Sequence, residues 1–354
     1  MNNLVIVKVG SNIIIDEQGQ VRAVIIENIL QALKNQLADG IRVVLVTSGA
    51  VALGKKFFVG KELNKKLAAG IGQMQLMSAY FDIAKRLGLP VMELLLSRPH
   101  LRQRQHFLNL QKLLNDAFSN NIIPIVNEND ILVYGTDWGF IDNDSLASSL
   151  AIALNADKLL ILSHVDGLFT GDPAKSDSVK LISEVKDVNK ELMKLCSADI
   201  ADNSRGGMIN KLKVIRLCAA VGIKSQIING LKTNLLSEAL AGKLVGTTFA
   251  ARNLEHLVKN RERWILAART SAASIMIDDG AIKALQNGKS LLAVGIKKIV
   301  GEFASCELVE LVSESLESIA IGMVDVSAKD LMQFDFKKQR GVQVMHADNL
   351  MVFI

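Results

Sequence analysis

The feature that most constrains the fold of this chain is a repeated alternation, up to about Phe249, between short apolar runs and longer segments with helical periodicity. Strands that alternate with helices of ten or more residues indicate βαβ units and a mainly parallel sheet. Nearly continuous apolar strands fit a sheet that is covered on both faces, so we expect an α/β fold. The predicted strands are Leu4–Val9, Ile41–Thr47, Val91–Ser97, Ile122–Val126, Lys158–Ser163 and Lys224–Ile228. The predicted helices are Val21–Leu37, Leu67–Leu87, Gln105–Phe118, Ser145–Leu154 and Asn210–Ala220.

The pattern changes after Phe249. A basic connector runs from Arg252 to Arg269, and short strand-like runs separated by glycines follow it. The sequence therefore predicts two domains, an α/β domain over residues 1–255 and a small β-rich domain over residues 270–354, both within the usual range of domain sizes. The strand-like runs of the second domain are Ser274–Ile277, Leu291–Val294, Leu308–Val312, Ile319–Val324 and Val342–Met345.

Composition argues against several classes of protein. Three cysteines, an odd number at wide spacing, offer neither a disulfide framework nor a zinc site. No uncharged run reaches the roughly eighteen residues of a membrane span, and the N-terminus lacks a basic leader, so we expect a cytoplasmic protein without a membrane partner. Aromatic residues make up only 5% of the chain, and the segment from Thr270 onward has eight Lys/Arg against eleven Asp/Glu, a net charge of −3. Both observations argue against nucleic acid as a partner.

The common phosphate-binding motifs are absent. Gly288-Lys289-Ser290 resembles the end of a P-loop, but the glycine required five residues earlier is Lys283. Gly70-Ile71-Gly72 is followed by Gln75, so the dinucleotide motif fails as well. The residues before Thr270 carry the remaining net charge of +8, from +5 minus −3, which suits either an anionic substrate or a solvated surface. A phosphate site must therefore use other segments.

Two predicted strands end in groups suited to an anion. Lys8-Val9-Gly10-Ser11 would present a point charge, and Gly10 would let backbone N–H groups approach a phosphate at the carboxyl end of a parallel strand. The alternative is a strand-end turn with a solvated lysine. Thr47-Ser48-Gly49-Ala50 joins the next strand to a helix-like segment. It would form an anion site at a helix N-terminus, or an ordinary N-cap serine.

A third segment is dense in carboxylates and amides. Asn127-Glu128-Asn129-Asp130 follows a predicted strand, and Asp142-Asn143-Asp144 comes a short loop later. Turns use Asn and Asp, but they seldom need so many. Such groups bind a cationic amino group, a hydroxyl or Mg²⁺, so we expect a binding site here.

Two further segments also contain residues typical of turns or binding loops. Gly206-Gly207-Met208 precedes a predicted helix with Lys211 in its first turn, as in a phosphate cradle, although a glycine-rich loop without a ligand is the alternative. Ser163–Pro173 closes the strand that begins at Lys158 and predicts a hairpin and turn with no catalytic role of its own.

In this order, the segments KVGS, VTSGAVALG, IPIVNEND, IDNDSLAS, HVDGLFTGDP and GGMINK resemble the amino-acid kinase family, and the C-terminal part resembles a PUA domain. The resemblance covers nearly the whole chain. It implies a three-layer αβα sandwich that holds ATP on one half and the phosphate acceptor on the other. It is strongest to members that use ATP and Mg²⁺ to phosphorylate the γ-carboxylate of L-glutamate, the first step of proline biosynthesis. It further implies a homo-oligomer, dimer or tetramer, and proline as a feedback inhibitor.

The resemblance also assigns roles to individual residues. Lys8 and Lys211 match the lysines that neutralise charge on the transferring phosphoryl group, and Asp144 matches the aspartate that orients both. No dedicated protein metal site is implied. The residues that match the glutamate site are Ser48, Asp130, Asn143 and, as a neighbour, Asn127. Those that match the ATP site are Lys8, Gly10, Ser163, His164, Arg205, Gly206, Gly207, Met208, Ile209, Asn210 and Lys211.

Two alternatives stay open. A kinase of the same family could use another acceptor, such as N-acetylglutamate, carbamate or aspartate, although Asp130 favours an acceptor with a free amino group. A protein of another class could bind RNA through the PUA-like domain, against which the acidic charge of that domain argues.

The chain departs from its relatives on the nucleotide side. Relatives usually have Thr-Asp where this sequence has Ser163-His164, and Gly-Thr-Gly-Gly where it has Ser204-Arg205-Gly206-Gly207. An imidazole thus replaces an acceptor carboxylate, and a protonated imidazole cannot accept a hydrogen bond. Arg205 meanwhile adds a cation beside the phosphate loop.

We therefore predict weak discrimination between ATP and GTP, and weaker discrimination at acidic pH, where imidazoles become protonated. The alternative is that His164 points to solvent and changes nothing. The kcat/KM values for both nucleotides, measured in the wild type and in His164→Asp, test the prediction. Strong selection of ATP that the substitution leaves unchanged would refute it.

Overall fold

The computed structural model describes residues 3–56, 64–132, 139–140, 142–171, 179–189, 191–193, 207–252, 258–268, 273–333 and 341–352. The chain divides into two compact units. One comprises Met1–His100, Gln105–Val133 and Gly139–Glu255, and the other comprises Leu101–Arg104, Tyr134–Trp138 and His256–Ile354. The domain limits 1–255 and 270–354 stay a prediction.

The first unit is built on an eight-stranded sheet with the order β3-β4-β2-β1-β5-β9-β10-β8. The six strands from β3 to β9 run parallel, and β10 lies antiparallel to β9. This confirms the predicted α/β fold with a mainly parallel sheet. The strands are β1 Leu4–Val9, β2 Arg42–Val46, β3 Val91–Leu96, β4 Ile123–Glu128, β5 Lys158–Ser163, β8 Glu184–Val185, β9 Lys224–Asn229 and β10 Thr247–Phe249.

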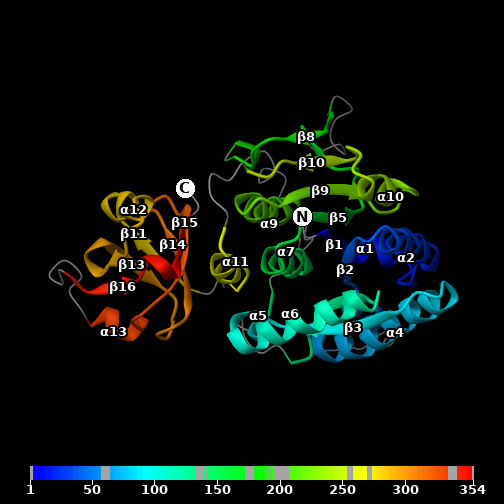
Figure 1. The fold of residues 1–354 in the computed structure, drawn as a ribbon, viewed down its shortest axis with the longest axis horizontal. Coiled ribbons are helices and arrows are strands. Elements are labelled where there is room, and N and C mark those ends of the chain that lie inside the picture. Colours follow the sequence, from blue (N-terminus) through cyan, green and yellow to red (C-terminus); the bar gives the residue numbers. More distant parts are fainter. Residues whose placement is uncertain are drawn as a thin grey trace. The chain divides into compact units, whose positions relative to one another are not determined.

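Helices cover both faces of this sheet, which gives the three layers of an αβα sandwich (Figure 1). One layer contains α2 Ala23–Ala38, α4 Lys65–Arg86 and α10 Leu235–Leu240, and the other contains α6 Arg104–Ser119, α7 Asn143–Ala153 and α9 Met208–Ala220. Alternate residues of a strand point to opposite faces, so Val5, Val7 and Val9 of β1 enter the core under the first layer, with Leu76 and Tyr80 of α4. Shorter helices are α1 Ser11–Ile14, α3 Ala50–Lys56 and α5 Arg98–Arg102.

Two predicted boundaries were wrong in a way that matters for the site. Strand β4 continues to Glu128, because Asn127 and Glu128 still pair with Leu95 and Leu96 of β3. Helix α7 begins at Asn143, two residues before the predicted start. Asn127 and Glu128 therefore belong to a strand, and Asn143 and Asp144 to a helix, and these regular elements hold their backbones in place. In the segment where we predicted a hairpin and turn, Ser163–Pro173, the structure has one short strand, β6 Leu168–Phe169; its antiparallel partner is β7 Leu181–Ile182, outside the predicted segment, and residues 172–178 lie outside the described residues.

The second unit is β-rich, with a five-stranded sheet in the order β13-β11-β14-β15-β17 and a two-stranded sheet of β12 and β16. Sequence reasoning missed β13, whose consecutive Lys297 and Lys298 break the alternation expected of a strand; the ladder has a register shift at this place. The strands are β11 Ser274–Ile277, β12 Leu291–Leu292, β13 Ile296–Val300, β14 Leu308–Val312, β15 Ser318–Met323, β16 Gln343–Met345 and β17 Leu350–Val352. The helices are α11 Asn260–Ala267, α12 Asp279–Gln286 and α13 Ala328–Met332.

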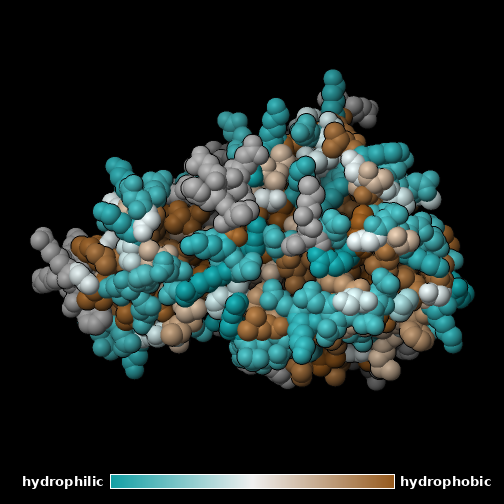
Figure 2. Space-filling view, in the orientation of Figure 1, coloured by the Kyte–Doolittle hydropathy of each residue, from teal (hydrophilic) through white to brown (hydrophobic). Residues whose placement is uncertain are grey.

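The surface view in Figure 2 is largely hydrophilic, with hydrophobic patches that include one over α6. Leu108 and Leu113 are exposed on that helix. Among the helices that the structure describes, none combines the length and the hydrophobicity that a membrane crossing requires.

Helices α3 and α4 touch through their backbones. A Cβ atom added to Gly72 would lie 1.8 Å from the carbonyl oxygen of Ala50, and one added to Gly54 would lie 1.8 Å from that of Ala68. Since real Cβ atoms do not approach backbone so closely, only glycine fits at these two crossings. This contact fixes α3, which begins directly after Ser48 and Gly49.

We predict that Gly72→Ala lowers the free energy of unfolding by about 3 kcal/mol or more, because the two helices must separate. Gly70→Ala in the same helix is the matched control: its added methyl meets only the side chain of Ile131, at 3.3 Å. We expect that control to be neutral or slightly stabilising, since alanine favours helix over glycine. Urea denaturation measures both, and equal effects of the two substitutions would contradict the proposed contact.

Candidate active site

The polar segments gather at the carboxyl edge of the parallel sheet. Lys8 lies near the end of β1, Asn127 and Glu128 end β4, and Ser163 ends β5. Because parallel strands point the same way, residues far apart in sequence meet at this edge, where α/β proteins bind their ligands. The N-termini of α7 and α9 complete the arrangement.

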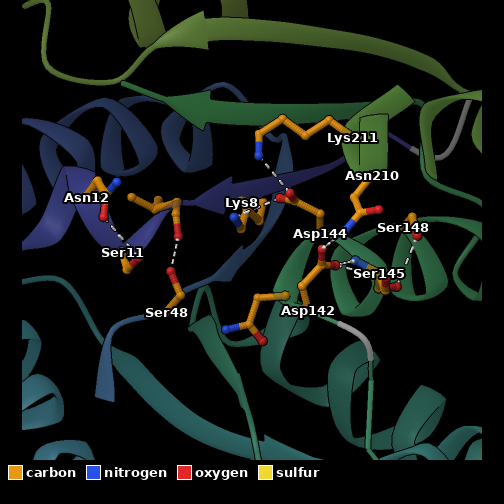
Figure 3. Close-up of polar contacts among 12 residues, drawn as sticks. Lys8, Ser11, Asn12, Ser48, Asp142, Asp144, Ser145, Ser148, Asn210 and Lys211 are labelled. Carbon is orange, nitrogen blue, oxygen red and sulfur yellow. Dashed lines mark hydrogen bonds and ion pairs between the residues drawn. The ribbon is translucent and has the colours of Figure 1, made fainter. Parts of the chain in front are cut away.

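At the centre, one carboxylate holds two lysines. Lys8 Nζ lies 2.7 Å from Asp144 Oδ1, and Lys211 Nζ lies 3.0 Å from Asp144 Oδ2 (Figure 3). Asp144 is 1% exposed and Lys8 is 7% exposed. Burial alone would raise the pKa of Asp144, but the charges and hydrogen bonds of Lys8 and Lys211 outweigh it and hold the pKa below its usual value. The three groups form a buried cluster with a net charge of +1.

At the N-terminus of α7, the N-cap Asp142 and the first helical residues Asn143 and Asp144 point in different directions. Asp142 caps the helix, with Oδ1 accepting hydrogen bonds from the backbone N–H and the hydroxyl of Ser145. Its Oδ2 faces Nδ2 of Asn210, at 3.4 Å, in the first turn of α9 (Figure 3). Asp144 lies where the N-terminal helix dipole stabilises a negative charge. The helix therefore orients Asp144 and contacts α9 at the same time.

The residues predicted to bind the acceptor lie on β4, α7 and the β2–α3 junction. Ser48 is buried, and its hydroxyl donates to the carbonyl of Val9 at 2.8 Å. Asn127 is 2% exposed, and its Oδ1 accepts from Nδ2 of Asn143 at 3.0 Å. The Oδ1 atom of Asn143 is buried and has no hydrogen-bond partner among the described residues. Asp130 forms an ion pair with Lys65, 3.0 Å apart, which sequence reasoning did not foresee.

The residues predicted to bind the nucleotide are described in part. Gly207 is the N-cap of α9, and Met208 to Lys211 form its first turn. Gly10 lies close under Lys8, since an added Cβ would lie 3.8 Å from Lys8 Nζ. Ser163 is buried, whereas His164 is exposed and its backbone carbonyl accepts from Asn229. Arg205 and Gly206 lie outside the described residues.

Sequence reasoning missed the polar groups behind the acceptor side. Gln73 of α4 donates to Glu93 of β3 at 2.6 Å and accepts from Asn127 at 2.7 Å. The sequence gives only a weak signal for Gln73, because a single glutamine in a long helix is common. Glu128 lines a small pocket together with Gln73 and Asp130. No three His, Cys, Asp or Glu side chains within the described ranges gather closely enough to hold a metal ion by themselves.

Glu128 is partly buried at the end of β4, where its Oε1 accepts from the backbone N–H of Phe140 at 2.5 Å. Burial raises the pKa of Glu128 to about 7 from an ordinary 4.5. The hydrogen bond from Phe140 opposes this, and Asp130 adds to it, while Lys65 and Arg98 lower the pKa. Above neutral pH the carboxylate is therefore ionised in an unfavourable position.

Because the folded state holds this proton more tightly than the unfolded state, the free energy of unfolding should fall as pH rises from about 4.5 to 7. We predict that Glu128→Gln removes this loss and is more stable than the wild type at pH 8, by on the order of 1–3 kcal/mol, with a smaller difference at pH 5. Glu184→Gln, at an exposed edge-strand position, serves as the control. Urea denaturation at both pH values measures the effect, and a difference independent of pH would contradict it.

Comparisons with known proteins agree with this arrangement. The amino acid kinase family model matches residues 3–229, and the PUA domain model matches residues 273–347. Two curated relatives are the glutamate 5-kinases of Vibrio vulnificus and Shewanella halifaxensis. The first is 34% identical over 330 residues, which cover 89% of this chain and 86% of the relative. The second is 33% identical over 352 residues, which cover 98% and 92%.

A solved structure shares the fold of the first unit. It is an isopentenyl phosphate kinase, 19% identical, with a TM-score of 0.50, and the match covers 70% of this chain and all of that one. At this identity the likeness supports the fold alone. The family model spans more than half of the chain, and the curated relatives match it over nearly their full length. The predicted family is thus confirmed: the chain belongs to the amino acid kinase family and carries a C-terminal PUA domain.

Proposed function

We propose that this protein is a glutamate 5-kinase, which transfers the γ-phosphoryl group of ATP to the side-chain carboxylate of L-glutamate. The product is glutamyl 5-phosphate, and the reaction is the first step of proline biosynthesis. The observation that carries the proposal is the buried carboxylate of Asp144 between Lys8 and Lys211. Two lysines held at one point suit a reaction in which an anion must approach an anion.

For this phosphoryl transfer, the protein needs to supply mainly positive charge and the correct position of the reactants. A carboxylate oxygen is already a nucleophile at neutral pH, so it needs no general base. It attacks the γ-phosphorus, the bond from that phosphorus to the bridging oxygen breaks, and ADP leaves with the electron pair. Catalysis of phosphoryl transfer is mostly positioning and stabilisation of charge. Lys8 and Lys211 supply the charge, and Asp144 fixes both ammonium groups.

The acceptor would lie against Ser48, Asn127, Asp130 and Asn143. Asp130 offers a negative charge to the α-ammonium of an amino acid, in competition with Lys65. On the other side, the backbone at Gly207 and the first turn of α9 would hold the phosphates, because a helix N-terminus attracts anions. Gly10, Ser163, His164, Arg205 and Gly206 belong to the same proposed nucleotide site.

Mg²⁺ is part of the proposal. A magnesium ion usually keeps several waters and binds through phosphates and one or two carboxylates, so it does not require a cluster of protein ligands. Asp142, whose Oδ2 lies 3.4 Å from Nδ2 of Asn210, would help to hold the ion, which would supply positive charge against the phosphates of ATP.

The family resemblance also supports a homo-oligomer, a cytoplasmic location and inhibition by proline, and these remain parts of the proposal. The rival enzyme would use N-acetylglutamate, carbamate or aspartate as acceptor. The rival of another class would bind RNA through the PUA domain, whose segment from Thr270 carries a net charge of −3.

An ADP-release assay with a panel of acceptors tests the proposal. Release with glutamate and not with N-acetylglutamate, carbamate or aspartate supports a glutamate 5-kinase. Release with another acceptor alone would reassign the substrate. No release with any acceptor would overturn the catalytic proposal and leave the RNA-binding alternative, which a binding assay with RNA would then examine.

We predict that Lys8→Ala and Lys211→Ala each lower kcat by several orders of magnitude with little change in KM for glutamate, because each lysine acts on charge that develops in the transition state. Lys224→Ala, at the exposed amino end of β9 in the same sheet, is the control and should keep wild-type kcat. Steady-state kinetics measure all three. Near-normal kcat in either active-site variant would remove that lysine from the mechanism.

A further inference from the structure

A chain of side-chain hydrogen bonds runs from the edge of the sheet to the acceptor site. Nε2 of Gln73 donates to Oε1 of Glu93 at 2.6 Å, and Oε1 of Gln73 accepts from Nδ2 of Asn127 at 2.7 Å. Oδ1 of Asn127 then accepts from Nδ2 of Asn143 at 3.0 Å. Four residues on β3, α4, β4 and α7 are thereby joined in one line.

At two places, the neighbouring group determines which end of a side-chain amide donates and which end accepts, and this sets the direction of the line of hydrogen bonds. The carboxylate of Glu93 can only accept, so the amide of Gln73 must turn its NH₂ group toward it. The backbone N–H of Glu128 donates to Asn127 Oδ1 at 2.9 Å, which requires the oxygen of Asn127 at that position. Both anchors impose the same direction, since turning Asn127 over would place two donors against each other at one end and two acceptors at the other.

The consequence appears at Asn143. Its NH₂ group is committed to Asn127, so its Oδ1 atom is the end that remains. That oxygen is buried without a hydrogen-bond partner among the described residues, which is costly for a polar atom and indicates a missing donor. If the line of hydrogen bonds had the opposite direction, Asn143 would present its NH₂ group to the substrate in place of its oxygen.

The acceptor substrate supplies such a donor at one place only. The two carboxylates of glutamate accept hydrogen bonds at neutral pH, and its α-ammonium is the one group that donates. An oxygen on Asn143 can therefore hold the ammonium end of glutamate, whereas an NH₂ group would hold a carboxylate. The direction of the hydrogen-bond chain decides which end of the substrate fits.

We propose that Glu93 and Gln73 are positioning residues that hold this direction together with the backbone N–H of Glu128, and so fix Asn143 as an acceptor for the α-ammonium group of the substrate. The inference rests on the proposed function, because it needs an amino acid as the phosphate acceptor. Neither residue touches the substrate. Gln73 is 9% exposed, whereas Glu93 is exposed on the edge strand β3, so substitutions at Glu93 leave the core intact.

The first test turns the contribution of Glu93 against the direction that the backbone N–H of Glu128 imposes on Asn127. Glu93→Lys places a donor where the chain needs an acceptor, so the amide of Gln73 should turn and present NH₂ to the NH₂ group of Asn127. We expect KM for glutamate to rise about tenfold, the effect of roughly one hydrogen bond, with kcat within about twofold of the wild type. Glutarate, which lacks the α-amino group, should compete with a Ki changed by less than about twofold. Damage to packing alone would raise KM for glutamate and Ki for glutarate together.

The second test restores the direction of the hydrogen bonds by exchanging the roles of positions 73 and 93. In the double variant Glu93→Lys with Gln73→Glu, the carboxylate at position 73 accepts from the lysine at position 93 and also from Asn127. We expect KM for glutamate to return to within about threefold of the wild type. Glu93→Gln alone should also stay within about threefold, because its carbonyl oxygen can still accept from Gln73, and position 73 still presents an acceptor to Asn127.

Glu184→Lys is the matched control, since Glu184 is an exposed glutamate on β8, the opposite edge strand of the same sheet. It reproduces the change of charge and should leave both constants unchanged. Wild-type protein without glutamate-dependent release of ADP would overturn the proposed function. An active wild type in which Glu93→Lys alters neither constant, alters both equally, or is not rescued by Gln73→Glu would overturn this inference and leave the proposed function standing.

Discussion

The structure of the site depends on one interaction, the buried carboxylate of Asp144 between the ammonium groups of Lys8 and Lys211. Removing one partner of a buried ion pair typically costs about 3–5 kcal/mol, because a charge is then left without compensation. The three residues come from α7, β1 and α9, so this requirement fixes three elements against each other. The net charge of +1 that remains suits an anionic phosphoryl group.

The N-terminus of α7 links the two halves of the site. Asp142 is the extended N-cap residue, and successive residues of the helix that begins at Asn143 point about 100° apart, so Asp142, Asn143 and Asp144 serve three different neighbours. Asp142 faces the first turn of α9, Asn143 joins the amides of the acceptor side, and Asp144 holds the lysines. A change in the position of this one turn would therefore alter the nucleotide side and the acceptor side together.

Much of the fold and part of the site followed from local pattern. Buried parallel strands are apolar runs, and β1, β5, β11 and β14 appear at the bounds that the sequence predicted. Strand β13 escaped prediction because its adjacent lysines disguise the alternation. Asn127 and Glu128 were placed after the end of the predicted strand Ile122–Val126, but the neighbouring β3 extends far enough to pair with them. Propensity yields to such tertiary pairing.

By itself, the sequence determined the order of strands and helices and the segments that end at the carboxyl edge of the sheet, because apolar periodicity and glycine, asparagine and lysine at strand ends are local signals. The tertiary structure alone decided which of these groups meet. The pairing of Asp130 with Lys65 and the line from Glu93 through Gln73 to Asn143 join residues on separate elements. Such contacts arise only when helices are packed on the sheet, since no spacing along the chain encodes the direction of a hydrogen bond between them.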